Sequence, residues 1–437
     1  MRTIRVGGLC LAALLLLPLG GRSERPLPLA APEGATTPLT GFVYEQNGFR
    51  LAHVDPATLE PTASSEHVPG YAGGWVRSPD RSRVAVAVEN SPGGPGSTLR
   101  LADAASLRWE SGSVVLDGYF RAALWPDVRT IVAVVDDGSH VRVENVDLVA
   151  QRVVGTQSVA GGVAAVARAD DSLAVLVRPA AKIGTARLLV VGSDGTVRRV
   201  ALGDVRVGVS FRRSAGSDMI GTIRQPGLAV DPADGTAYVV EADGRITEID
   251  LRSLAVREHR VARSLVSRLD GWLTPPAEAK GLNGPTRRAT WLGDGLVAVT
   301  GSNQTALRTK QGAVVASGAP AGLVILDTRD WHTRMLDPRA DTAVVAAGML
   351  LATGASWRSG PLRTTNTGEG VAAYGAEGSL RWRFDDGATR WVAAVYDSLA
   401  LVGRTNGVYD VIDVRTGSIV GPGIAGPVPQ LLLGSGS

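Results

Sequence analysis

Short apolar runs alternate with compact polar turns along almost the whole chain after residue 40. The stretch 407–421, GVYDVIDVRTGSIVG, shows the pattern: an apolar strand, a polar turn and the start of a second strand. Val, Ile and Tyr favour extended backbone, whereas Asp, Thr and Gly favour turns. Long amphipathic helical patterns are rare. The pattern therefore predicts many short β-strands joined by tight turns.

The strand and turn pattern is repeated. Each repeat reads as strand, turn, strand, loop, strand, turn and strand, and the spacing of about fifty residues is that of a four-stranded propeller blade. A partner pattern, an inner strand followed by a turn and a second strand, recurs as in ALWPDVRTIVAVV and LAVDPADGTAYVV. The third strand with its turn occurs in eight copies, which begin at Arg50, Leu99, Val141, Leu188, Ile246, Leu323, Val371 and Tyr409.

The ends of the chain complete the pattern. The first copy lacks an inner strand, and the apolar segment VPQLLLG, which begins at Val428, is left over at the C-terminus. One such sheet cannot bury both of its faces, but a ring of them can, and a closed ring leaves no open edge. We predict an all-β, eight-bladed β-propeller in a single domain, 41–437, closed by pairing of the N- and C-terminal segments. Seven blades are the alternative, if one weak copy is an insertion.

Two segments carry a family resemblance. VIDVRTGSIVG, residues 411–421, resembles the YVTN repeat, and EGSLRWRF, residues 377–384, resembles the PQQ-like repeat. The chain is thus similar to the YVTN and PQQ-like repeat β-propellers of bacterial exported proteins, over nearly all of its length after residue 40. The resemblance implies the fold more than the function, because these families include scaffolds, sensors and enzymes.

The N-terminus has the pattern of a secretory signal. Arg2 and Arg5 precede an apolar run from Leu9 to Leu19, and small residues follow. This run is shorter than the roughly 20 apolar residues that span a bilayer. We expect a signal peptide at 1–21, with a cut near Ala30 or an uncleaved anchor as alternatives. A secreted or cell-envelope location follows.

The remainder of the N-terminal region is predicted to be a disordered leader or tether, 22–40, rich in Pro, Ala and Thr. If Cys10, the chain's one cysteine, leaves with the signal, the exported chain has neither a disulfide nor a cysteine nucleophile. We expect no membrane-spanning segment beyond the signal, no nucleic-acid partner, and a monomer.

Four connections are longer than the rest. Antiparallel connectivity places 203–224, 262–288, 302–320 and 353–369 on one face of the ring, in adjacent blades. Long loops on a rigid frame are common binding sites. They carry a formal charge of +8 together, against +3 for the whole chain, and such a field attracts anions. The alternative is that these basic residues only keep the long loops soluble and bind no partner.

The predicted binding residues are the basic and tryptophan side chains of these connections. The tryptophans could stack on a sugar or anchor a protein partner, or they could pack within the loops. The set is Arg212, Arg213, Arg224, Trp272, Lys280, Arg287, Arg288, Arg308, Lys310, Trp357, Arg358 and Arg363.

Known catalytic and metal-binding motifs do not occur in the sequence. The five histidines are scattered without metal-ligand spacing, and neither a GxSxG elbow nor a complete calcium loop occurs. The PQQ-like resemblance raises the alternative of a quinoprotein dehydrogenase. In those enzymes the cofactor commonly stacks on a disulfide, which the exported chain lacks. We therefore predict no catalytic residue, metal or cofactor. The predicted function is binding or scaffolding of an anionic envelope ligand or protein; the alternative is a propeller enzyme, an oxidoreductase, lyase or hydrolase, with its site at the central channel.

Overall fold

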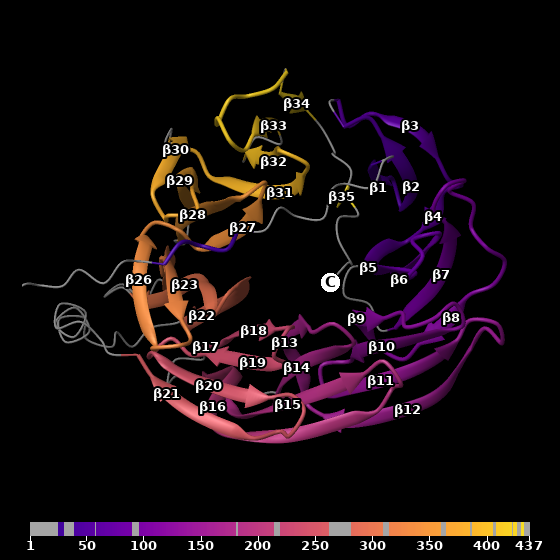
Figure 1. The fold of residues 1–437 in the computed structure, drawn as a ribbon, viewed down its shortest axis with the longest axis horizontal. Helices are drawn as coiled ribbons and strands as arrows, with labels where there is room; N and C mark the ends of the chain where they lie inside the picture. The colour runs from indigo at the N-terminus through magenta and orange to yellow at the C-terminus, as the bar shows by residue number, and fades with distance from the viewer. Residues whose placement is uncertain are drawn as a thin grey trace, which may run out of the picture.

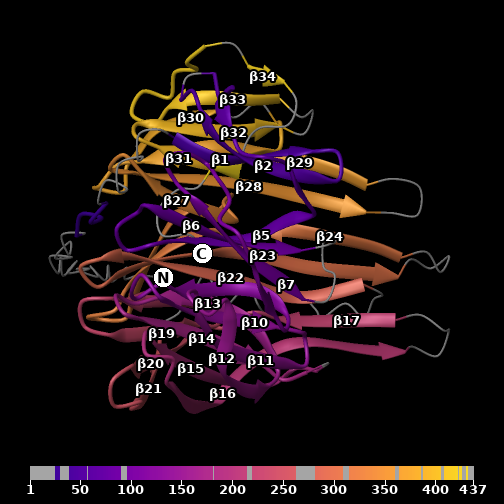
Figure 2. The ribbon, with the colours of Figure 1, turned by 90° about the vertical axis from the view of Figure 1, so that its right-hand side faces the viewer.

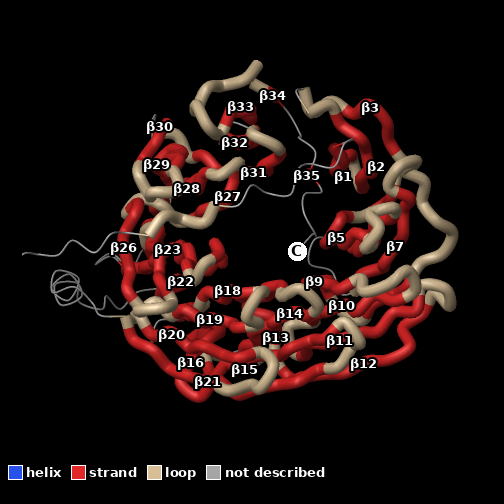
Figure 3. Tube along the Cα trace, viewed as in Figure 1, coloured by secondary structure: helices blue, strands red, loops and turns tan. Residues whose placement is uncertain are grey.

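The chain folds into antiparallel β-sheets arranged around a common centre (Figure 1). The computed structural model describes residues 25–29, 39–56, 58–89, 96–180, 182–213, 219–261, 281–308, 314–359, 364–384, 387–404, 408–421, 423–425 and 430–431. Figure 3 shows these residues as strands and connecting turns. Among them no helix is long and apolar enough to cross a membrane.

Most strands form consecutive groups of four, in which each strand pairs with the next in the chain. The first group also takes a strand from the C-terminus: Leu431 and Gln430 pair with Gly41 and Phe42. The first four groups consist of β35 (Gln430–Leu431), β1 (Leu39–Glu45), β2 (Gly48–Val54) and β3 (Pro61–Ser64), with β4 (Val68–Pro69) beside β2; β5 (Tyr71–Arg77), β6 (Arg83–Glu89), β7 (Ser97–Asp103) and β8 (Val114–Leu116); β9 (Tyr119–Leu124), β10 (Thr130–Asp136), β11 (His140–Asp147) and β12 (Arg152–Ala160); and β13 (Gly162–Arg168), β14 (Ser172–Arg178), β15 (Gly184–Gly192) and β16 (Val197–Arg213).

The second half of the chain continues the same order, with two additional strands, β17 (Met219–Arg224) and β24 (Val314–Pro320), between the groups or within them. Its groups are β18 (Gly227–Asp231), β19 (Thr236–Val240), β20 (Arg245–Asp250) and β21 (Val256–Arg260); β22 (Gly281–Gly293), β23 (Leu296–Arg308), β25 (Leu323–Asp327) and β26 (His332–Asp337); β27 (Thr342–Ala346), β28 (Met349–Ser359), β29 (Thr364–Tyr374) and β30 (Leu380–Phe384); and β31 (Arg390–Tyr396), β32 (Leu399–Arg404), β33 (Val408–Asp413) and β34 (Ile424–Ala425).

The core lies between the sheets, because the strands are apolar on both faces. In β10, Ile131, Ala133 and Val135 pack against the preceding group, while Val132 and Val134 pack against the following one. This division follows from the two-residue period of a strand. Each apolar cluster of the described residues joins two groups in this way.

One cluster joins the last group to the first. Tyr396 and Leu401 of the last group pack with Leu39, Val54 and Leu431. The Tyr396 hydroxyl donates to the Pro56 carbonyl oxygen at 2.9 Å. Burial raises the pKa of this hydroxyl to about 12, so it remains a donor at neutral pH.

The predicted long loops are largely strands, which corrects that part of the sequence interpretation. β16 and β17 form a hairpin, as do β23 with β24 and β28 with β29. Figure 2 shows all three projecting from the same side of the molecule. The predicted placement on one face therefore agrees with the structure in the described parts.

The hairpins join into one sheet, which we call the crown sheet. It consists of residues 208–213 of β16, β17, residues 281–286 of β22, residues 300–308 of β23, β24, residues 354–359 of β28 and residues 364–368 of β29. β17 pairs in parallel with β22, as in Ile220 with Gly281, and β24 pairs with β28, as in Gly318 with Trp357. The residues between the hairpin strands, 214–218, 309–313 and 360–363, lie outside the described chain.

Two glycines allow strands to pass from the ring into the crown sheet. Gly284 has φ of 132° and Gly301 has φ of 147°, values that side-chain-bearing residues rarely adopt. A Cβ at either position would lie 2.0 Å from a carbonyl oxygen of a neighbouring strand, Ile223 or Thr286. The strands bend where only glycine fits.

Tyr396 provides a test of the contact between the last and first groups. Tyr396→Phe removes the bond to Pro56 and should lower the free energy of unfolding by about 1 kcal/mol. Tyr396→Ala leaves a cavity and should cost about 3–5 kcal/mol. Tyr71→Phe is the control, because Tyr71 is 40% exposed. Urea unfolding measures the stability of all three variants. A Tyr396→Ala protein as stable as wild type would contradict the stabilising contact between the last and first groups.

Candidate functional site

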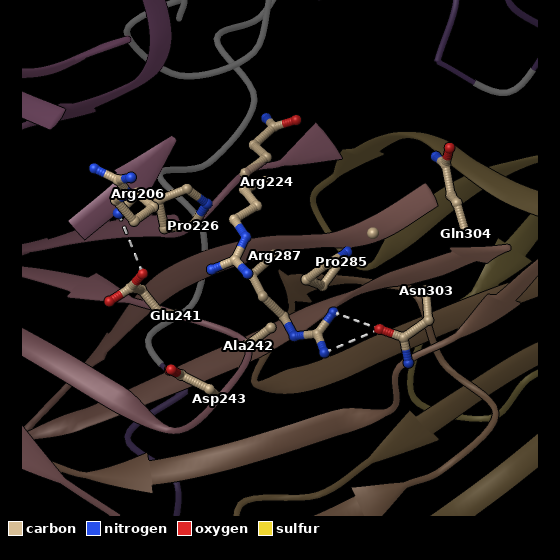
Figure 4. A pocket seen from close by; sticks show the side chains of 12 residues that line it. Arg206, Arg224, Pro226, Glu241, Ala242, Asp243, Pro285, Arg287, Asn303 and Gln304 are labelled. Carbon is tan, nitrogen blue, oxygen red and sulfur yellow. Dashed lines mark hydrogen bonds between the residues drawn. The ribbon is translucent and has the colours of Figure 1, made fainter. Parts of the chain in front are cut away.

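A cavity of 610 Å³ lies at the base of the crown sheet (Figure 4). Three arginines from different strands line it: Arg206 of β16, Arg224 at the end of β17 and Arg287 of β22. The antiparallel pairing of the ring and the parallel pairing of β17 with β22 bring these positions together. The other lining residues are Gln225, Pro226, Glu241, Ala242, Asp243, Gly284, Pro285, Asn303 and Gln304.

Arg287 is held by neutral oxygens. Its Nη1 donates to the Thr286 carbonyl at 2.9 Å, and both terminal nitrogens contact Asn303 Oδ1, at 3.2 and 3.1 Å. Among the described residues no carboxylate acts on the pKa of Arg287. Burial lowers the pKa of Arg287. A partly buried cation without an anion nearby favours the approach of an anionic ligand.

Arg206 and Arg224 are exposed and have free guanidinium donors. Among the described residues neither side chain has a hydrogen-bonded or ion-paired partner; only the Arg206 backbone N–H donates, to Glu241 Oε1 at 3.4 Å. Figure 4 shows Arg224 directed into the middle of the group, between Glu241 and Arg287. Together the three arginines present unpaired positive charge to a single cavity.

The cavity's two carboxylates share one ion-paired arginine, Arg245. Arg245 Nη2 lies 3.3 Å from Glu241 Oε1, and its Nε lies 2.9 Å from Asp243 Oδ2. Burial is the largest effect on Glu241 and raises its pKa, which the Arg206 N–H and Arg245 oppose. Arg245 offsets one of these two negative charges and the other offsets one lining arginine, so the cavity keeps a net positive charge.

The remaining predicted residues have different surroundings. Arg288 is exposed, and its Nη1 lies 3.3 Å from Thr342 Oγ1 of β27, near half-buried Asp341, whose pKa is raised by its partial burial. Arg358 is exposed on the crown sheet, paired through its backbone with Ser317. The strand positions of Arg212, Arg213 and Arg308 lie at the outer ends of crown hairpins.

Trp357 packs within the crown sheet. It pairs with Gly318 of β24, where an added Cβ would lie 2.1 Å from the Trp357 Nε1 atom. Its indole is partly buried against the neighbouring strand, which fits the alternative role of loop packing. The predicted residues Trp272, Lys280, Lys310 and Arg363 lie outside the described residues.

Sequence reasoning missed several residues of the cavity. Arg206 was counted in the charge of its connection without being selected, and Asn303 and Gln304 carry no motif. Glu241 and Asp243 lie in a short turn between β19 and β20, which received no attention because of its length. The same connectivity rule that grouped the long connections places this turn on their face.

The described residues contain no group of His, Cys, Asp and Glu side chains that could hold a metal ion. A second cavity of 230 Å³ adjoins the first and is lined by Asp204, Glu241, Arg245, Glu258 and His259, among others. His259 stacks on Trp331 with ring centroids 3.5 Å apart, and its Nε2 lies 2.8 Å from Glu248 Oε2. These contacts hold His259 between strands of neighbouring groups.

The fold is similar to that of a known propeller. Dihydro-heme d1 dehydrogenase NirN, solved in complex with DHE, matches with a TM-score of 0.51 and 15% identity, over 93% of this chain and 78% of that one. BamB from Moraxella catarrhalis (TM-score 0.39, 13% identity, 90% and 87% covered) and Sqt1 from Saccharomyces cerevisiae (0.44, 11%, 82% and 87%) are looser matches.

NirN is a β-propeller. At such low identity the likeness shows the fold alone. No protein-family model matches the chain, and no curated protein sequence matches it either. The fold is therefore propeller-like, while the YVTN and PQQ-like resemblance stays a prediction.

Glu241 gives the cavity a testable pH dependence. Because burial raises its pKa above the ordinary 4.5, the folded state favours the protonated carboxyl, and wild-type stability should fall as pH rises through that pKa. Glu241→Gln has no titrating carboxyl at this position and should lack this pH dependence. The free energy of unfolding of wild type should therefore fall relative to that of Glu241→Gln as the pH rises from acidic to neutral. Urea unfolding from pH 4 to 8 measures the difference. Parallel pH profiles would contradict the assignment.

Proposed function

We propose that the protein is an exported, eight-bladed propeller of the YVTN or PQQ-like repeat type that binds an anionic partner through the crown sheet. Eight blades match the eight groups into which the described strands fall, and contacts of Leu431 and Tyr396 with the first group support closure by the chain ends. The N-terminal signal pattern supports export to the cell envelope or beyond.

The observation that carries the binding proposal is the set of three arginines around one cavity. Arg206 and Arg224 have unused donors, and Arg287 is fixed in place by neutral oxygens with no carboxylate to balance it. Guanidinium groups bind carboxylates and phosphates through paired hydrogen bonds, and such bonds strengthen where water is partly excluded. A pre-positioned Arg287 flanked by two adjustable arginines fits this use.

The chemistry of the partner follows from the site. A cavity of 610 Å³ with an exposed positive rim suits acidic side chains of a protein segment, or a carboxylated or phosphorylated envelope ligand. The crown sheet extends the contact area beyond the cavity, with Arg358 exposed on it. We take a protein segment rich in Asp and Glu as the primary partner class.

A charge variant with a matched control tests the proposal. Arg206→Gln combined with Arg224→Gln should weaken binding of a fluorescent ten-residue polyglutamate peptide by about tenfold, or about 1.4 kcal/mol. The control combines Arg108→Gln and Arg129→Gln, which are exposed in turns on the opposite face and remove the same charge. Fluorescence anisotropy at two salt concentrations measures both proteins.

Both double variants should melt at the wild-type temperature, because none of the four side chains is buried. Wild-type binding should weaken with salt, since exposed charges are screened. Equal loss in the control would show that net charge alone acts, and unchanged binding in the cavity variant would overturn the proposed site.

A further inference from the structure

The segment 25–29, Arg-Pro-Leu-Pro-Leu, lies against the face opposite the crown sheet. It falls inside the region predicted to be a disordered leader or tether. Figure 2 shows it in indigo at the left, away from the hairpins at the right. Its contacts are the turns between β22 and β23, after β25, between β27 and β28, and between β29 and β30. It therefore crosses from one strand group to the next.

Leu27 fills an apolar pocket between these groups. It is 2% exposed and packs in one cluster with Leu292, Leu323, Leu350 and Tyr374. Burying a leucine to this extent contributes about 1.5–3 kcal/mol relative to leaving it in water. Its backbone N–H donates to the Ala376 carbonyl oxygen. A disordered tether would make neither contact.

Arg25 forms ion pairs with two carboxylates of the group that contains β22, β23 and β25. Its Nη1 lies 2.8 Å from Asp327 Oδ2, and its Nη2 lies 3.0 Å from Asp294 Oδ2. The Arg25 carbonyl oxygen accepts a hydrogen bond from Arg334 at 3.3 Å. Both the side chain and the backbone of this residue are therefore recognised.

The prolines restrict the segment to a bound shape. Leu29 N–H donates to the Leu27 carbonyl at 2.9 Å, which closes a three-residue turn around Pro28. Pro28 lies beside Gly293, where a side chain would come within 3.4 Å of it. Proline lowers the conformational entropy lost on ordering, so such a segment docks at less cost than a flexible one.

We propose that the seam groove, formed by Leu292, Asp294, Leu323, Asp327, Tyr374 and Ala376, is a binding site whose occupant is the chain's own segment 25–29. The groove has an acidic subsite for Arg25 and an apolar subsite for Leu27. Docking there fixes the point at which the leader departs, on the face opposite the arginine-lined cavity. A leader held at a membrane surface thus turns the crown sheet away from that surface.

An added peptide tests whether the groove recognises this sequence. Leu27→Asp in the full chain should expel the native segment and allow a fluorescein-labelled ERPLPLA peptide to bind. Wild type should bind it at least tenfold more weakly, because its own segment competes at high effective concentration. The peptide ERPDPLA should bind neither protein. A folded Leu27→Asp protein that ignores ERPLPLA, or wild type that binds it equally well, would overturn the proposal.

A label on the leader gives a second readout that leaves the apolar pocket intact. Cys10→Ser with Ser23→Cys places one fluorophore two residues before Arg25. Arg25→Glu removes both ion pairs and should lower the anisotropy of the label. Arg129→Glu makes the same charge change on the same face, away from the groove, and should leave the anisotropy unchanged. An Arg25→Glu protein whose label is as restrained as wild type would overturn the proposal.

Discussion

The structure depends on one constraint: every four-stranded sheet is apolar on both faces and must cover both. Consecutive residues of β10 divide between two neighbouring clusters, and no strand can satisfy both faces within its own group. The sheets therefore stack side by side around a centre, and each seam buries what two groups would otherwise expose. Tyr396 lies where the last group meets the first: its ring packs with residues of both groups, and its hydroxyl donates to the Pro56 carbonyl oxygen of the first.

The two faces of this arrangement carry connections of different lengths. The turns of one face are short and are fixed by their own Asp and Thr side chains, as where Asp413 Oδ1 accepts from the Thr416 N–H at 2.8 Å. The connections of the other face are long enough to pair with each other, and they build the crown sheet. Arg224 and Arg287 meet because β17 and β22 pair in parallel at its base. Segment 25–29 lies on the short-turn face, opposite the crown sheet.

The repeat was readable from sequence because alternation and turn residues are local properties. The stretch 407–421 predicts a strand, a turn and the start of a second strand; the structure has β33 and the turn that follows Asp413, but in place of the second strand only a single bridge from Ile412 to Ile419. Connectivity also placed the long connections on one face without any knowledge of contacts. The sequence could not show that these connections are strands. The segment 314–320 is a strand because β23 and β28 pair with it on either side. β23 is its hairpin partner, whereas β28 is distant in the sequence. Likewise Arg287 was selected for its charge, whereas its burial and its bonds to Asn303 come from tertiary packing.

Hydrogen exchange of the crown sheet tests the central claim most directly, because a continuous paired sheet and a set of long loops differ in their amide protection. Mass spectrometry of peptides that cover residues 208–213, 219–224 and 314–320 should show exchange slowed by about a hundredfold or more relative to the unfolded chain. Amides of β10, in the middle of a ring sheet, provide the internal reference for a protected strand. Complete exchange of the three crown segments at the earliest time point, with β10 still protected, would contradict the account.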